Sequence, residues 1–142
     1  VDLLSTDLVY TGTYAISLAA QAWVALSLHH AALVTVPFYW LEFYVRRTSA
    51  EKRLNAFSHN ADDQELRERP LDDCRYTDET PIQPEVWTRV RIPLDHLNAA
   101  ERPITRVSIR NHNDYSSTFW VDEVRLLGAT WHSDLPVVMR ED

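Results

Sequence analysis

The stretch WTRVRIPLDHL, residues 87–97, decides the fold together with two stretches that follow it, ITRVSIRN at residues 104–111 and TFWVDEVRL at residues 118–126. In each stretch apolar and polar residues alternate, and β-branched and aromatic residues are frequent. This pattern is typical of a half-buried β-strand. Because neighbouring side chains of a strand point to opposite faces, Val90 and Ile92 are predicted to face the core and Arg89 and Arg91 to face outward.

Similar patterns extend over most of the chain. We expect strands near residues 13–19, 22–30, 38–46, 53–59, 87–94, 104–111 and 118–127. Residues 60–86 are acidic and contain three prolines, so we expect a long irregular segment there, with at most one short strand within residues 66–74. Residues 95–101 could form one helical turn. Short strands at regular intervals predict an all-β fold, an antiparallel two-sheet β-sandwich in which residues 1–142 form a single domain.

Three further stretches support a family resemblance. They are TGTYAISL at residues 11–18, WVALSLHH at residues 23–30 and YWLEFYV at residues 39–45. In this order, and followed by the three stretches above, they resemble secreted carbohydrate-binding modules of the galactose-binding-domain-like, jelly-roll group, over residues 9 to 129. The resemblance implies a secreted, accessory domain of a larger polysaccharide-active protein, which binds a poly- or oligosaccharide without catalysis.

The ends of the chain depart from this pattern. Modules of the group open with an extra strand before the turn that here begins at residue 11, and only residues 1–10 precede it. The tail, residues 130–142, contains a Val-Val-Met sequence similar to that missing first strand. Two interpretations remain open: the tail replaces the first strand, as in a circular permutation, or it is a linker remnant. An unfilled slot would leave an unpaired sheet edge.

Composition excludes several classes of protein. The net charge of −7 argues against a nucleic-acid partner, and no apolar run is long enough to span a membrane. Cys74 is the only cysteine, so no internal disulfide can form. The chain begins with Val1 and shows no signal peptide, and we expect a mature or excised secreted domain.

Glycine is scarce, since only Gly12 and Gly128 are present where an average chain of this length holds about ten. The loops at residues 46–53 and 60–64 therefore have to turn without glycine or accept backbone strain. Both natural drift and sequence engineering could explain this departure from the family pattern.

Motifs of enzymes are absent, with no G-x-S-x-G elbow, no H-E-x-x-H pair and no glycine-rich phosphate loop. Cys74 has no partnered base in the sequence. The Asp72 and Asp73 pair is interpreted as part of a solvated loop rather than a glycosidase dyad. We therefore expect no enzymatic activity.

Outward positions of the expected strands combine aromatic and arginine side chains. Aromatic rings stack on the apolar face of a pyranose, and guanidinium groups hold hydroxyls or carboxylates. The candidate ligand-binding residues are Tyr44, Phe57, His59, Trp87, Arg89, Arg91, Arg106, Arg110 and Trp120. Because two sheets share these strands, the residues cannot all line one groove. The outward arginines also predict a preference for uronate-containing glycans. The competing interpretation is an ordinary solvated sheet surface.

A structural Ca²⁺ is implied by the same resemblance. Modules of this group bind it between the N-terminal strand and the carboxylates of the closing strand, here Asp122 and Glu123. The other ligands would have to come from Asp2, Asp7 or the tail acids Glu141 and Asp142. Calcium takes six to eight oxygen ligands. The alternatives to carbohydrate binding are a structural or adhesive protein-interaction module and an engineered scaffold on this fold.

Overall fold

The structure, a computed structural model, describes residues 2–5, 15–34, 38–48, 53–128, 132–134 and 139–141. These residues form 11 strands and two short 3₁₀-helices. In chain order the elements are β1 (Asp2–Ser5), β2 (Ala15–Ala20), β3 (Ala25–Val34), β4 (Phe38–Arg47), β5 (Leu54–Asn60), β6 (Arg69–Pro70), η1 (Cys74–Tyr76), β7 (Thr88–Pro93), η2 (Leu94–Leu97), β8 (Pro103–Asn111), β9 (Ser117–Gly128), β10 (His132–Asp134) and β11 (Met139–Glu141).

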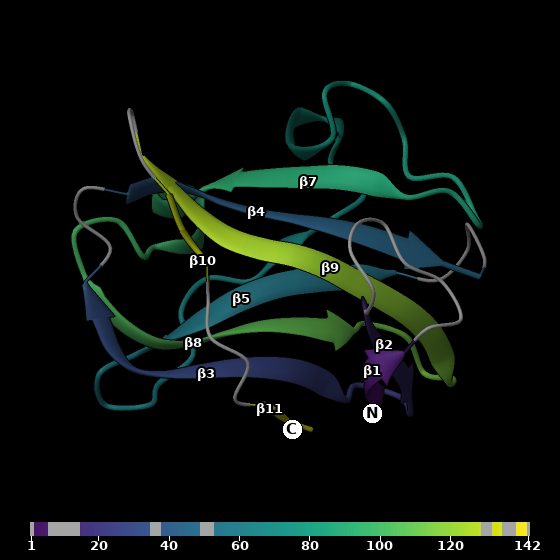
Figure 1. The fold of residues 1–142 in the computed structure, drawn as a ribbon, viewed down its shortest axis with the longest axis horizontal. Helices are drawn as coiled ribbons and strands as arrows, with labels where there is room; N and C mark the ends of the chain where they lie inside the picture. The colour runs from purple at the N-terminus through teal and green to yellow at the C-terminus, as the bar shows by residue number, and fades with distance from the viewer. Residues whose placement is uncertain are drawn as a thin grey trace.

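The strands form two antiparallel sheets (Figure 1). Sheet A has the order β1-β2-β9-β4-β7, with β10 also paired to β9, and sheet B has the order β11-β3-β8-β5-β6. The two sheets pack face to face, which confirms the predicted all-β sandwich. All seven expected strands are present, the short strand expected within residues 66–74 is β6, and the expected helical turn begins one residue early as η2.

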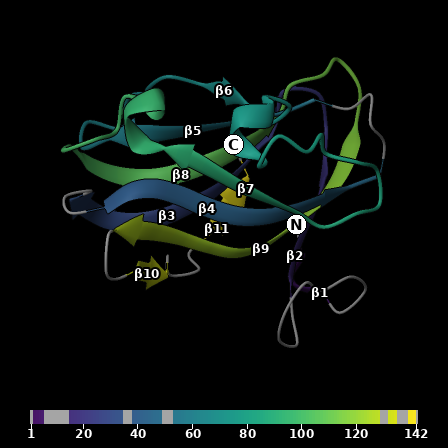
Figure 2. The same cartoon turned by 90° about the horizontal axis from the view of Figure 1, so that it is seen from above.

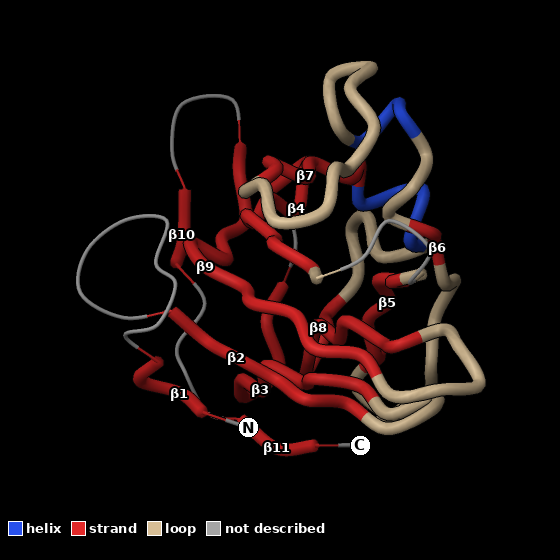
Figure 3. Tube along the Cα trace, turned by 90° about the vertical axis from the view of Figure 1, so that its right-hand side faces the viewer, coloured by secondary structure: helices blue, strands red, loops and turns tan. Residues whose placement is uncertain are grey.

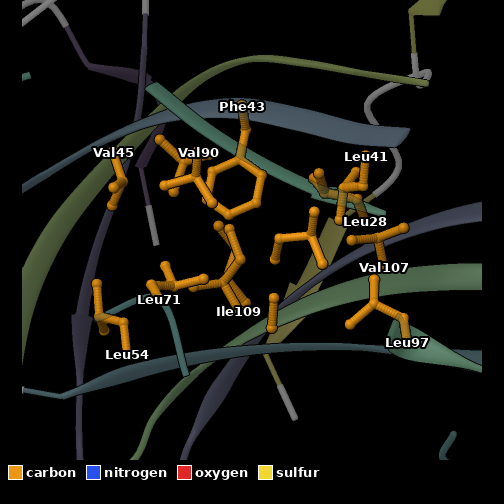
Figure 4. Close-up of a cluster of buried hydrophobic side chains, with 14 of the residues drawn as sticks. Leu28, Leu41, Phe43, Val45, Leu54, Leu71, Val90, Leu97, Val107 and Ile109 are labelled. Atoms are coloured by element: carbon orange, nitrogen blue, oxygen red, sulfur yellow. The ribbon is translucent and has the colours of Figure 1, made fainter. Parts of the chain in front are cut away.

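The core lies between the sheets. Figure 4 shows Phe43 and Val45 of β4 pointing toward Ile109 of β8 and Leu54 of β5, and all four side chains are buried. Val90 and Ile92 of β7 are also buried, as their alternation predicted. Burying one such side chain contributes about 1.5–3 kcal/mol, so this interface is the main source of stability.

Residues 60–86 and η2 cover the edge of the core between β7 and β5. Figure 3 shows the two 3₁₀-helices beside β6 and β7. Leu71, Ile82 and Leu97 are buried in the same cluster as the sheet residues. Arg47, at the end of β4, anchors this segment, since its Nη2 donates to the carbonyl oxygen of Ile82 at 3.0 Å and its Nη1 lies 2.9 Å from Oδ1 of Asp72. The acidic segment therefore covers part of the core.

Both ends of the chain contribute edge strands. β11 pairs with β3, with Met139 opposite Leu28, and β1 pairs with β2. β10 returns along β9, as Figure 2 shows. The remaining residues of the tail proposed to replace the first strand, 130–131, 135–138 and 142, lie outside the described residues.

Turns without glycine adopt left-handed backbone conformations. Among the described residues, those other than glycine with positive φ are Trp23, Asp63, Asp78, Glu79, Glu85, Asn98, Glu101 and Glu123. Such φ values are uncommon for residues with a Cβ. Because glycine is scarce, several turns thus hold a residue with a Cβ in a strained backbone conformation. No helix in the described part of the chain is long and apolar enough to cross a membrane.

Candidate functional site

The candidate residues are divided between the two outer faces of the sandwich. Tyr44 of β4 lies opposite Arg89 of β7, and Trp120 of β9 lies opposite Arg46 of β4, all on sheet A. Phe57, His59, Arg106 and Arg110 lie on the outer face of sheet B, and Trp87 immediately precedes β7. One ligand-binding surface can therefore include only part of the set.

The outer face of sheet B is covered by side chains of the same chain. The guanidinium carbon of Arg110 lies 4.4 Å from the ring centroid of Phe57. Arg110 Nη2 donates to Glu65 at 2.6 Å and its Nη1 donates to Glu68 at 3.4 Å, which holds the guanidinium over the ring. Phe57 is only 1% exposed and His59 4%. Neither ring offers a free face for stacking on a sugar.

The outer face of sheet A carries aromatic side chains that are accessible in part. Along β4 the outward residues Trp40, Glu42 and Tyr44 lie opposite Pro93, Arg91 and Arg89 of β7. Trp40 and Trp120 are half-buried. Trp40, Tyr44 and Trp120 therefore share one face, with charged groups between the rings.

Glu42 lies at the centre of this face, between Trp40 and Tyr44. The Nε and Nη2 atoms of Arg91 both donate to Oε2 of Glu42, at 3.0 and 2.7 Å. Arg125 of β9 lies on the other side, with its Nε 4.0 Å from Oε1, and it also forms an ion pair with Glu123. The guanidinium carbon of Arg91 is 5.8 Å from the Trp40 ring centroid, within cation–π range. Arg91 is thus oriented by both a carboxylate and a ring.

The rim of the face is also charge-compensated. Arg89 forms an ion pair with Asp78 of the segment that covers the core edge. The hydrogen bond to Asp78 raises the pKa of Arg89 above its ordinary value. Arg89 therefore stays cationic and is already partnered by a carboxylate.

Sequence reasoning missed three residues of this face: Trp40, Glu42 and Arg125. The alternation of YWLEFYV indicates Trp40 and Glu42, because Phe43 and Val45 are core residues. For Arg125 the signal is local, because the apolar Val124 and Leu126 flank it, whereas alternation continued from Phe119 and Val121 would turn it inward. A β-bulge near Glu123, where φ is 53°, inserts an extra residue, so that Leu126 faces the core and Arg125 faces outward.

The expected calcium ligands do not form a complete site among the described residues. Glu123 is engaged by Arg125, and Oδ1 of Asp122 accepts a hydrogen bond from the backbone N–H of Glu123 at 2.8 Å. Nothing is described of the side chain of Asp2, whose backbone pairs with Ser17. In the described ranges, no group of three or more His, Cys, Asp or Glu side chains could hold a metal ion. Calcium binding stays a prediction from the family resemblance.

A second set of exposed aromatic residues lies at the loops that join β2 to β3 and β8 to β9. Trp23 is 52% exposed and contacts His112 edge-on, and Tyr115 is 43% exposed. The buried Asn111 connects the two loops, because its Nδ2 donates to the carbonyl oxygens of Gln21 at 3.0 Å and Tyr115 at 2.8 Å. These loops are distinct from the outer face of sheet A.

Comparison with known proteins supports the fold only. No protein-family model matches the chain, and no curated protein matches it. Among solved structures, the chain is similar to the crystal structure of a β-1,2-glucanase from Parabacteroides distasonis, with 16% sequence identity and a TM-score of 0.66. The similarity covers 89% of this chain and 20% of the glucanase chain. The chain thus matches about a fifth of a longer carbohydrate-active protein.

Proposed function

We propose that this chain is a non-catalytic carbohydrate-binding module that binds a poly- or oligosaccharide on the outer face of sheet A. The observation that carries the proposal is the presence of Trp40, Tyr44 and Trp120 on one face around the Glu42 and Arg91 ion pair. Aromatic rings supply stacking surface for pyranoses, and the fixed polar groups supply donors and acceptors for hydroxyls. This combination suits a sugar better than a purely apolar partner.

The spacing of the rings favours a ligand of more than one sugar unit. Trp40 and Tyr44 are four residues apart on β4, which at about 3.3 Å per residue places their Cα atoms about 13 Å apart. Trp120 extends the set, because it lies opposite Arg46 on the neighbouring strand. A chain of pyranoses could contact several rings along this direction.

The accessory role belongs to the same proposal. One structural neighbour is a glucanase whose chain is much longer than the part that this chain matches. A secreted accessory domain of a polysaccharide-active protein is consistent with that relation. In such a role the chain would hold the polysaccharide and leave its chemistry to another domain.

Affinity electrophoresis through gels that contain soluble polysaccharides tests the proposal. We expect retention by at least one polymer, and about fivefold weaker binding for Trp40→Ala and Trp120→Ala, since a stacking contact contributes about 1 kcal/mol. Tyr115→Ala is the matched control, because this exposed aromatic lies in the loop between β8 and β9. Absence of retention on every polymer, or equal losses for all three variants, would contradict the proposal and favour a protein-interaction module.

A further inference from the structure

The outer face of sheet A carries balanced charge. Among the side chains that the structure describes, its arginines and their neighbouring carboxylates are equal in number, four of each, so that their formal charges cancel. The groups are Arg46, Arg89, Arg91 and Arg125 against Glu42, Asp78, Asp122 and Glu123. Three of the arginines are already paired, with Asp78, Glu42 and Glu123. A face built to attract an acidic polymer would have an excess of unpaired arginine.

The arginines on the outer face of sheet B are compensated in the same way. Arg106 Nη2 lies 3.0 Å from Oδ1 of Asp63, and Arg110 is paired with Glu65 and Glu68. All four arginines from which the sequence predicted a uronate preference therefore have carboxylate partners within the chain. The net charge of −7 adds a repulsion for polyanions.

We infer that the ligand of sheet A, given the proposed function, is a neutral glycan rather than a uronate-containing one. A sugar hydroxyl both donates and accepts hydrogen bonds, so it can bind to an arginine N–H and to a carboxylate oxygen at once. A uronate carboxylate only accepts, and here it would approach Glu42 and Glu123 while competing with them for Arg91 and Arg125. A preference for neutral glycans therefore replaces the preference for uronate-containing glycans that we expected from the sequence.

Binding to neutral and acidic polymers at two salt concentrations tests the inference. The probes are a soluble β-glucan and a xyloglucan as neutral polymers, with polygalacturonate and alginate as acidic ones. We expect binding to a neutral polymer that changes less than about twofold between about 20 and 500 mM NaCl, because salt screens only the interactions of charges. Preferential binding to a polyuronate, weakened by salt, would overturn the inference but leave carbohydrate binding standing. Binding to no polymer would refute both.

Asp78→Asn gives an independent readout. The change keeps the shape of the side chain, and asparagine tolerates the positive φ of residue 78. It removes the carboxylate that neutralises Arg89. We expect the variant to gain about twofold to fivefold in affinity for polygalacturonate at low salt, the range of a single exposed ion pair. Asp62→Asn, which removes an exposed charge in the loop after β5, is the control. Equal affinity of Asp78→Asn and Asp62→Asn would show that pairing of Arg89 does not restrain uronate binding, contrary to the inference.

Discussion

Glu42 and Arg91 form a two-point contact across β4 and β7, in which Nε and Nη2 of Arg91 both donate to the same carboxylate oxygen of Glu42. Glu42 is 5% exposed although its side chain lies on the outer face of a sheet. Arg91 and Arg125 on the flanking strands shield it from water. The pair therefore fixes the position of the charged groups at the centre of this face. Its own geometry in turn depends on the flanking strands.

Replacing Glu42 with Gln should lower stability measurably. The variant keeps the shape of the side chain and removes the charge that pairs with Arg91. Because Arg91 is 39% exposed and can be solvated, we expect a loss of about 1–2 kcal/mol in the free energy of unfolding, less than for a fully buried pair. Urea unfolding measures the change. A double-mutant cycle with Arg91→Met should give a coupling energy of about 1 kcal/mol, and additivity of the two substitutions would show that the pair is not energetically coupled.

Truncation of Phe119 and truncation of Trp120 should affect different properties, stability and glycan affinity, although the two residues are neighbours on β9. Phe119 is fully buried, so Phe119→Ala should reduce stability by about 3–5 kcal/mol. Trp120 is half-buried on the outer face, and Trp120→Ala should affect glycan affinity more than folding. Thermal midpoints and affinities of both variants separate the two roles. If Trp120→Ala unfolds the domain, the ring stabilises the sheet instead of serving as a binding platform.

The same strand shows how far sequence patterns lead. Strict alternation in the stretch TFWV puts Phe119 and Val121 inward and Trp120 outward, in agreement with the burial of Phe119 and Val121, because every residue of a regular strand obeys the same two-residue period. The alternation fails beyond the bulge at Glu123, and Arg125 joins the face for that reason. A bulge is a property of the pairing with β4, which the local sequence does not specify.

Burial of an outward residue is equally hard to predict. Alternation along β5 correctly puts Phe57 on the outer face of the sheet, whereas Leu54 and Ala56 face the core. Its ring is nevertheless buried under Arg110, which is positioned by Glu65 and Glu68 from a distant segment of the chain. The same long-range pairing neutralises the arginines. Patterns of residues predict which face a side chain occupies, whereas its partners depend on segments that only the folded chain brings together.

Asp73 should contribute a small, pH-dependent stability. It caps η1, where Oδ1 accepts the backbone N–H of Arg75 at 3.0 Å and the carboxylate also accepts from the Arg75 side chain. These hydrogen bonds lower the pKa of Asp73 below its ordinary value of 3.8. The contribution is therefore fully present well above pH 3.8 and is lost as the pH falls through the lower folded-state pKa.

The expected cost of Asp73→Ala at neutral pH is at most about 1 kcal/mol, since the pair is at the surface and screened by solvent. Unfolding free energies of wild type and variant between neutral and strongly acidic pH check this. The difference between them should shrink at the acidic end. A pH-independent difference for Asp73→Ala would indicate a cap that does not depend on charge.

Removal of the tail should destabilise the sandwich. Deleting residues 131–142 removes β10 from β9 and β11 from the edge of β3. We expect the free energy of unfolding to fall by several kcal/mol. This is a large part of the total for a typical domain, which is about 5–15 kcal/mol. A shorter deletion of residues 135–142 retains β10 and separates the two contributions. A truncated chain with the thermal midpoint of the full chain would identify the tail as a linker.

Introducing a glycine should stabilise the chain at a turn in which a residue with a Cβ has a positive φ. Glu101 is exposed in the turn between η2 and β8 and has a φ of 56°, a left-handed conformation that costs a residue with a Cβ about 1–2 kcal/mol. Glu101→Gly relieves this strain but increases the entropy of the unfolded chain by about 0.5–1 kcal/mol, which leaves an expected net gain of about 0.5–1 kcal/mol. Glu101→Ala is the matched control, because alanine keeps the Cβ and gains nothing. Denaturant unfolding of both variants measures the difference, and equal stabilities would show that residue 101 is not strained in solution.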